Sequence, residues 1–164
     1  MKYFEDISLG EVWDLGNREV GGEEIVAFAT RYDPQPFHID QTAAEDGFFG
    51  TLIASGWHTN AMAMGLLANY IKVHKLDSLG APGIDRCRWL VPVRPSDVLS
   101  GRCTVMALRL SGSRPMGLVT LRTEVFNQGA AKVVQLDGVG MYGCRPPNAE
   151  GLAGDVTDAV SATT

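Results

Sequence analysis

The sequence has few cysteines, no long hydrophobic run and no N-terminal apolar stretch. Its 164 residues include three cysteines, Cys87, Cys103 and Cys144, which lack the spacing of metal ligands. A small, odd number of cysteines indicates reduced thiols rather than a disulfide framework. No run approaches the roughly 18 apolar residues of a membrane span, and the first residues do not resemble a signal peptide. We therefore expect a cytoplasmic protein without a membrane partner.

Basic residues are also scarce. The chain has 14 Lys and Arg against 19 Asp and Glu, so its net charge is −5. This balance argues against nucleic acid as the main partner. One segment differs, because residues 86–122 contain seven arginines, no lysine and a single acid, Asp97. Some of these arginines, Arg88 and Arg94 among them, could receive the phosphates of a small molecule, or they could lie on the solvent side of strands.

The first half of the chain has the pattern of helices. Its total length suits one domain with a single core. Apolar residues recur at helical spacing from Ile25 to Tyr32, and this helix should end at Asp33, before Pro34. A short helix is expected over 41–46. A long, nearly all-apolar helix is expected over 56–74, and such a helix should be buried on most sides.

The second half alternates apolar and polar residues, which is typical of strands with one half-buried face. We expect four strands, over residues 84–91, 98–110, 117–127 and 131–143. Asn127-Gln128-Gly129-Ala130 should form a hairpin turn. Helices followed by an antiparallel meander indicate an α+β fold. The small, polar-rich residues 145–164 are expected to form a disordered tail.

The segment Asp33-Pro34-Gln35-Pro36-Phe37-His38 suggests an active site. Its two prolines prevent a continuous helix, so we expect a stiff turn that holds Asp33 and His38 at a set distance. A carboxylate and an imidazole held together can polarise a water or transfer a proton at neutral pH. About twenty residues later, Ser55-Gly56-Trp57 begins the long helix, whose first amides can hold an oxyanion.

Simpler explanations exist for each of these residues. Asp33 could be a turn residue that ends a helix, and His38 a polar residue near a turn. His58 follows Ser55 by three residues, which suggests a Ser–His nucleophile, but no Gly-x-Ser-x-Gly elbow surrounds the serine. Asp40 is expected to cap the next helix. A metal site made of His38, Asp40 and His58 lacks paired ligand spacing, so we expect no metal.

Three blocks of the chain resemble the MaoC-like dehydratase and (R)-specific enoyl-CoA hydratase family. Residues 28–40 resemble its helix followed by Asp-x-Asn-Pro-Leu-His-x-Asp. Ile53-Ala54-Ser55-Gly56 resembles its Ile-Ala-His-Gly, and residues 89–97 resemble its Phe-x-x-Pro-Val-x-Pro-Gly-Asp. The resemblance covers about residues 8–143. It implies a single hot-dog domain over residues 1–144, in which an antiparallel sheet wraps around a long central helix.

The resemblance also implies a reaction, the reversible addition of water across the 2,3-double bond of an enoyl-CoA or a related acyl thioester. Asp33 and His38 match the family's catalytic pair, and the Gly56 amide matches its donor to the thioester carbonyl. No cofactor is implied, because the coenzyme A thioester is the substrate, and a homodimer is expected. An acyl-CoA thioesterase and a non-catalytic acyl-thioester-binding protein remain as alternatives.

Three residues depart from the family's pattern. Gln35 stands where the family has Asn, Ser55 where it has His, and Ala61 where hydratases have an active-site serine. These departures leave the choice of acyl group open. We expect substrate contacts from six residues around the pair: Gln35, Phe37, Ser55, Trp57, Arg88 and Arg94. The aromatic residues near the site, including Trp89 and Phe48, could equally belong to the core.

Overall fold

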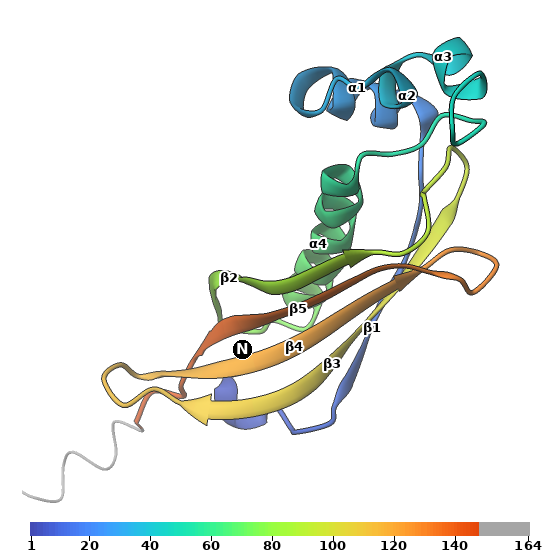
Figure 1. The fold of residues 1–164 in the computed structure, drawn as a ribbon. Helices are drawn as coiled ribbons and strands as arrows, with labels where there is room; N and C mark the ends of the chain where they lie inside the picture. The colour runs from blue at the N-terminus through green and yellow to red at the C-terminus, as the bar shows by residue number, and fades with distance from the viewer. Residues whose placement is uncertain (148–164) are drawn as a thin grey trace, which may run out of the picture.

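The computed structural model describes residues 1–147. Its five strands form one antiparallel sheet in the order β1-β3-β4-β5-β2 (Figure 1). In chain order the elements are a 3₁₀ turn (Phe4–Asp6), β1 (Val12–Glu19), α1 (Gly22–Tyr32), α2 (Pro36–Ile39), α3 (Gln41–Glu45), α4 (Gly56–Val73), β2 (Ser78–Trp89), β3 (Val98–Leu110), β4 (Met116–Phe126) and β5 (Lys132–Gly143). This is the α+β hot-dog arrangement expected from the sequence.

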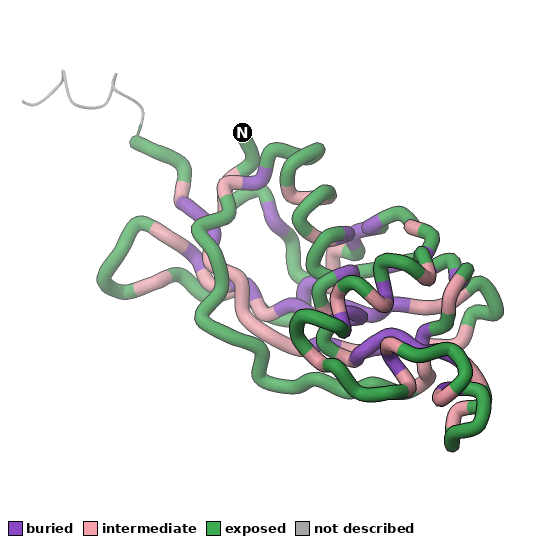
Figure 2. The backbone as a smooth tube through the Cα atoms, turned by 90° about the horizontal axis from the view of Figure 1, so that it is seen from above, coloured by how far each residue is buried: buried purple, intermediate pink, exposed green. Residues whose placement is uncertain are grey.

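The long helix α4 lies on one face of the sheet, and α1–α3 gather beyond its first turn (Figure 1). Trp13 of β1 stacks on Tyr70 of α4, with ring centroids 5.2 Å apart. Leu66 of α4 belongs to the same buried cluster as Trp13 and Tyr142. A second cluster joins Met62 of α4 to α1 and to the neighbouring strands. The core therefore fixes the start of α4 relative to α1. Figure 2 shows where buried and exposed segments alternate along the backbone.

The prediction that α4 is buried on most sides was wrong for the single chain. Its sheet-facing residues, such as Met62 and Leu66, are buried. Ala61, Met64 and Gly65 are exposed. Around Met64 the exposed side of α4 is apolar, and such a surface is usually covered by another element or ligand.

The turn after α1 differs in detail from the expectation. α1 ends at Tyr32, before Asp33 and Pro34, as predicted. Pro36 then begins the four-residue helix α2 rather than an open turn. Proline is well tolerated as a first helical residue, because its missing N–H would have had no helical partner. Asp40 caps α3 by accepting a hydrogen bond from the Ala43 amide, as expected.

Three of the four predicted strands are confirmed, with ends that differ by at most one residue, and the Asn127 turn joins β4 to β5. β2 differs, because it begins at Ser78 and not at residue 84. Its Gly80-Ala81-Pro82-Gly83 segment resembles a loop in the sequence. β2 is an edge strand, where a proline and the observed register shifts disrupt no second neighbour.

Most of the predicted C-terminal tail lies outside the described residues. Arg145, where that tail was expected to begin, still contacts the domain, because its guanidinium forms an ion pair with Asp6 at 2.7 Å. Within residues 1–147, no helix has both the length and the apolar character needed to cross a membrane.

Candidate active site

The structure brings Asp33 and His38 together. Asp33 follows the last turn of α1, and His38 lies in α2, just beyond the two prolines. The His38 Nε2 atom is 3.4 Å from the Asp33 Oδ2 atom. His38 is 4% exposed, whereas the Asp33 side chain is more open to solvent. The pair therefore lies at the boundary between the core and an open cavity.

One tautomer of His38 is favoured by its surroundings. The His38 Nδ1 atom is 2.8 Å from the Ile53 carbonyl oxygen. A carbonyl oxygen can only accept a hydrogen bond, so Nδ1 carries the proton of the neutral ring. The lone pair then lies on Nε2, which faces Asp33. His38 can accordingly accept a proton at Nε2 and release it again.

The Asp33 carboxylate is held by two neutral donors. Ser55 Oγ donates to Asp33 Oδ2 at 2.7 Å, and Gln35 Nε2 donates to Oδ1 at 2.8 Å. These hydrogen bonds, that from Ser55 most strongly, lower the pKa of Asp33 below its usual range. Asp33 is therefore an ionised group at neutral pH.

Gly56 places a free amide at the start of α4. It is the first residue of the helix, and within residues 1–147 its N–H donates no hydrogen bond. A Cβ atom at this position would lie 2.5 Å from Trp89 Cε2, so only glycine fits beneath the indole ring. The amide points from the positive end of the helix dipole, where negative charge is stabilised.

A cavity of about 560 Å³ joins these groups. Of the nine site residues predicted from the sequence, six line it: Asp33, Gln35, Phe37, His38, Gly56 and Trp57. Trp89 closes one side and packs edge-on against Trp57. The cavity thus has an acid–base pair at one wall, a hydrogen-bond donor at another and aromatic rings between them.

The other three predicted residues do not line the cavity. Ser55 has no exposed surface and lies behind Asp33, where its Oγ also accepts from the Trp57 amide and caps α4. Arg88 neighbours Gln135 across the sheet, on the face opposite Trp89, because successive strand residues point to opposite faces. Arg94 lies in the loop before β3 and is exposed.

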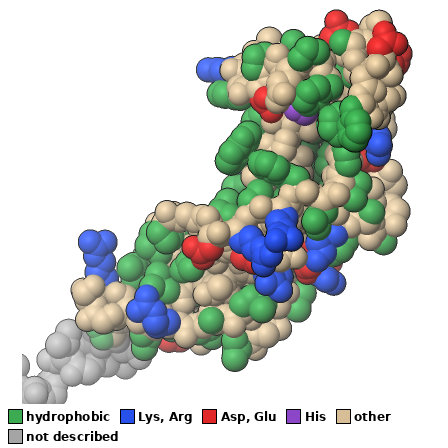
Figure 3. Space-filling model, in the orientation of Figure 1, with side chains coloured by type: hydrophobic (Ala, Val, Ile, Leu, Met, Phe, Trp, Pro, Cys, Tyr) green, Lys and Arg blue, Asp and Glu red, His purple; other side chains and the backbone are tan. Residues whose placement is uncertain are grey.

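The other basic side chains of this region lie mainly on the outer face of the sheet, where Figure 3 shows several Lys and Arg residues together. Two of them are already paired. Arg122 donates to Asp137 at 2.7 Å, and Arg102 donates to Glu124 at 2.8 Å. Alternation along the strands, rather than a phosphate site, accounts for the positions of these two arginines.

A second polar cluster, which the sequence did not reveal, lies behind α1. Buried His58 of α4 stacks on Phe28, and its Nε2 is 3.3 Å from Glu24 Oε1. Glu24 also pairs with Arg18 of β1. Burial lowers the pKa of His58, although Glu24 opposes this effect, so the ring is neutral at neutral pH. His58 therefore fastens α1 to α4 and does not approach Ser55 as a catalytic base would.

No group of three or more His, Cys, Asp or Glu side chains within residues 1–147 is arranged to hold a metal ion. His38, Asp40 and His58 are used separately, for the Asp33 pair, the cap of α3 and the Glu24 contact.

Comparison with known proteins agrees with this geometry. The profile of the family described as "MaoC like domain" matches residues 8–126. The chain is 26% identical over 131 residues to the uncharacterised protein YdeM of Bacillus subtilis, which covers 80% of this chain and 92% of YdeM.

Two solved structures extend the similarity. A MaoC-like dehydratase from Rhodospirillum rubrum is 34% identical, with a TM-score of 0.78 over 90% of this chain and 100% of that one. The (R)-hydratase from A. caviae involved in PHA biosynthesis is 27% identical, with a TM-score of 0.66 over 83% of this chain and 97% of that one. The family match over residues 8–126 includes the Asp33–His38 segment and the central helix α4.

Proposed function

The chain belongs to the MaoC-like domain family, and from this premise we propose that it is an (R)-specific hydratase or dehydratase of enoyl thioesters, with coenzyme A as the carrier. The observation that carries the proposal is the approach of Asp33 and His38 to 3.4 Å in the cavity that also exposes the Gly56 amide. An acid–base pair and an oxyanion donor on the same cavity are what hydration of a conjugated thioester needs.

In the hydration direction, a water molecule binds between Asp33 and His38. The ionised Asp33 carboxylate orients the water, and His38 Nε2 takes its proton as the oxygen bonds to C3 of the enoyl group. The proton is then delivered to C2 from the same side, which gives syn addition. The Ile53 carbonyl keeps Nδ1 protonated throughout, so that Nε2 alone exchanges the proton.

Attack at C3 moves negative charge onto the thioester oxygen. We place this oxygen at the Gly56 N–H, where the dipole of α4 stabilises an enolate. Removing one such donor typically slows an enzyme by about 100-fold to 1000-fold. The aromatic side chains of Phe37, Trp57 and Trp89 exclude bulk water around the acyl group.

The test follows the loss of ultraviolet absorbance of the conjugated enoyl thioester on a panel of enoyl-CoAs. We expect turnover by the wild type, and Asp33→Asn and His38→Gln should each lose about 100-fold or more. Matched controls are Asp40→Asn, which keeps a cap for α3, and His74→Gln, at an exposed histidine. Both should retain activity.

A parallel assay for free thiol separates hydration from thioester hydrolysis. Release of coenzyme A that depends on Asp33 would replace the proposal with a thioesterase. If both Asp33→Asn and His38→Gln keep wild-type turnover, Asp33 and His38 are not the catalytic residues.

We also propose that the protein acts as a homodimer. Every residue of edge strand β2 is exposed, and Leu79 of this strand and Leu90 just after it are exposed apolar side chains. An unpaired strand edge beside exposed apolar groups favours pairing with a second chain. Light scattering during size-exclusion chromatography should give twice the mass of one chain, and a monomeric mass would contradict the proposal.

A further inference from the structure

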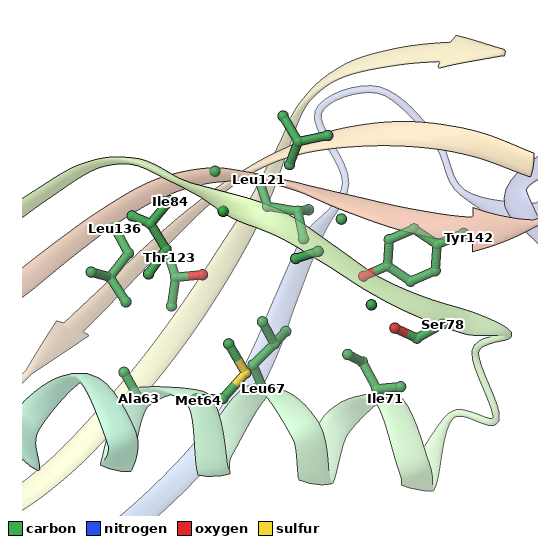
Figure 4. Close-up of a pocket in the computed structure, with 16 residues that line it drawn as sticks. Ala63, Met64, Leu67, Ile71, Ser78, Ile84, Leu121, Thr123, Leu136 and Tyr142 are labelled. Carbon is green, nitrogen blue, oxygen red and sulfur yellow. The ribbon is translucent and has the colours of Figure 1, made fainter. Parts of the chain in front are cut away.

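An apolar groove continues along α4 beyond the active-site cavity. It lies between α4 and β2 and has a volume of about 200 Å³ (Figure 4). Met64, Leu67 and Ile71 of α4 form one wall, and Ile84 of β2 lies opposite. Its lining is mainly apolar, with the hydroxyl residues Ser78, Thr123 and Tyr142 among it, so the groove suits a hydrocarbon chain rather than a charged group.

The active-site cavity and this groove have the same two walls but share no lining residue. Along α4, Gly56 and Trp57 line the cavity, and Met64 lines the groove two turns later. Along β2, Trp89 lines the cavity and Ile84 lines the groove. The two spaces therefore lie one after the other along α4 and β2, with Asn60 lining neither of them.

Asn60 lies between the two spaces and contacts two residues of β2. It lies one turn after Gly56 and one turn before Met64. Its Oδ1 accepts a hydrogen bond from Trp89 Nε1 at 3.1 Å. Its amide nitrogen is 3.5 Å from the sulfur of Cys87. The side chain thus spans the gap between α4 and β2 and places a polar amide across an otherwise apolar path.

We propose that Asn60 is a gate that limits the length of the acyl chain, and that the groove beyond it binds the tail of a longer chain once the gate is removed. This inference rests on the proposed function. A thioester whose carbonyl lies at Gly56 directs its acyl chain along α4 toward Asn60. A short chain ends before the gate, whereas a longer one must break the Asn60–Trp89 hydrogen bond and pass a polar group without replacing that bond.

The test compares kcat/KM for four-carbon and eight-carbon trans-2-enoyl-CoAs. Burial of one methylene is worth roughly fourfold, so four more methylenes in the groove allow a gain on the order of 100-fold. Asn60→Ala should raise the eight-carbon to four-carbon ratio by at least about tenfold. The control Asn60→Asp keeps the acceptor for Trp89 Nε1, and its ratio should stay within about threefold of the wild type.

Blocking the groove provides a second check. In the double variant Asn60→Ala/Ile84→Trp, an indole fills the space opposite Met64, and the gain for the longer chain should disappear. Asn60 is an incompletely buried helix position, so alanine there is compatible with folding. An unchanged ratio in Asn60→Ala, or a gain that survives Ile84→Trp, would overturn the proposal.

Binding measurements test the role of Asn60 in chain-length selection independently of the hydration reaction. Calorimetry gives the Kd of butyryl-CoA and octanoyl-CoA, which are saturated and cannot be hydrated. Asn60→Ala could raise the affinity for octanoyl-CoA relative to butyryl-CoA by about tenfold while neither the wild type nor the variant hydrates an enoyl-CoA. This result would support the role of Asn60 as a gate and refute the proposed hydratase activity. If the protein hydrates enoyl-CoAs but Asn60→Ala changes neither the kcat/KM ratio nor the Kd ratio of the two chain lengths, the hydratase activity is supported and the gate is refuted.

Discussion

Replacing Ser55 by alanine should affect both stability and the ionisation of Asp33. The Ser55 hydroxyl has two roles at once, because it donates to Asp33 Oδ2 at 2.7 Å and accepts from the Trp57 amide at 3.2 Å. The residue is fully buried, so water cannot readily replace either bond. Ser55→Ala removes the helix cap and the hydrogen bond to the carboxylate together.

The expected loss in the free energy of unfolding can be divided between these two roles of Ser55. Loss of a serine cap typically costs about 1 kcal/mol. A hydrogen bond to a charged group contributes about 1.5–3 kcal/mol, and the partial exposure of Asp33 favours the lower end of that range. We therefore expect the free energy of unfolding to fall by about 2–3 kcal/mol at neutral pH.

A double-mutant cycle in urea separates the two contributions. In the Asp33→Ala background only the cap remains to be lost, so Ser55→Ala should then cost about 1 kcal/mol. All four proteins are compared at one concentration, because the stability of an oligomer depends on concentration. Equal losses in both backgrounds would refute the interpretation that Ser55 supports the Asp33 carboxylate.

The same variant should change the pH dependence of the free energy of unfolding. The pKa of Asp33 is lowered, so the ionised group stabilises the fold above its unfolded pKa, and this stability is lost as pH falls through the folded value. Without Ser55 the folded pKa of Asp33 rises toward its ordinary value. The free energy of unfolding lost between pH 7 and acidic pH should therefore be smaller in Ser55→Ala than in the wild type, and equal losses would contradict this argument.

Two further predictions concern α4. Gly56→Ala keeps the amide N–H, but its Cβ would displace Trp89, and a donor misplaced by about 1 Å should lower kcat/KM by about 100-fold. Gly65→Ala, whose Cβ would meet nothing within 4 Å, should keep activity and stabilise the protein by about 0.5–1 kcal/mol. Burial depresses the pKa of His58, so its contribution to stability is present above its unfolded pKa near 6.5 and declines as pH falls below that value. Urea unfolding of His58→Gln, which keeps an amide donor for Glu24, should show a smaller loss of stability from pH 7 to 5 than the wild type, and parallel losses would contradict the reasoning.

Local signals were enough to predict the end of α1, the cap at Asp40 and three strands. These features depend on proline geometry, on short-range hydrogen bonds and on alternation within one segment. The start of β2 at Ser78 could not be read in the same way. A glycine- and proline-rich segment is tolerated there because β2 pairs with β5 on one side only, which is a property of the sheet order.

The parts of the site that the sequence did not reveal depend on distant contacts. Asn60 meets Cys87 and Trp89 across 27 and 29 residues of chain. Ser55 was expected to touch the substrate, yet the structure places it behind Asp33, 22 residues earlier in the chain. No periodicity within one element contains such information, because each contact forms only when α4 is docked against α1 and β2.

The hydrogen bonds around Asp33 explain two of the residues that depart from the family's pattern. Gln35 is longer than the asparagine it replaces, and its amide reaches Asp33 Oδ1, while Ser55, in place of histidine, donates to Oδ2. Both donors are neutral, so each stabilises the carboxylate without adding a second titrating group beside His38. The two replacements thus agree with the proposed mechanism, in which Asp33 stays ionised and His38 transfers the proton.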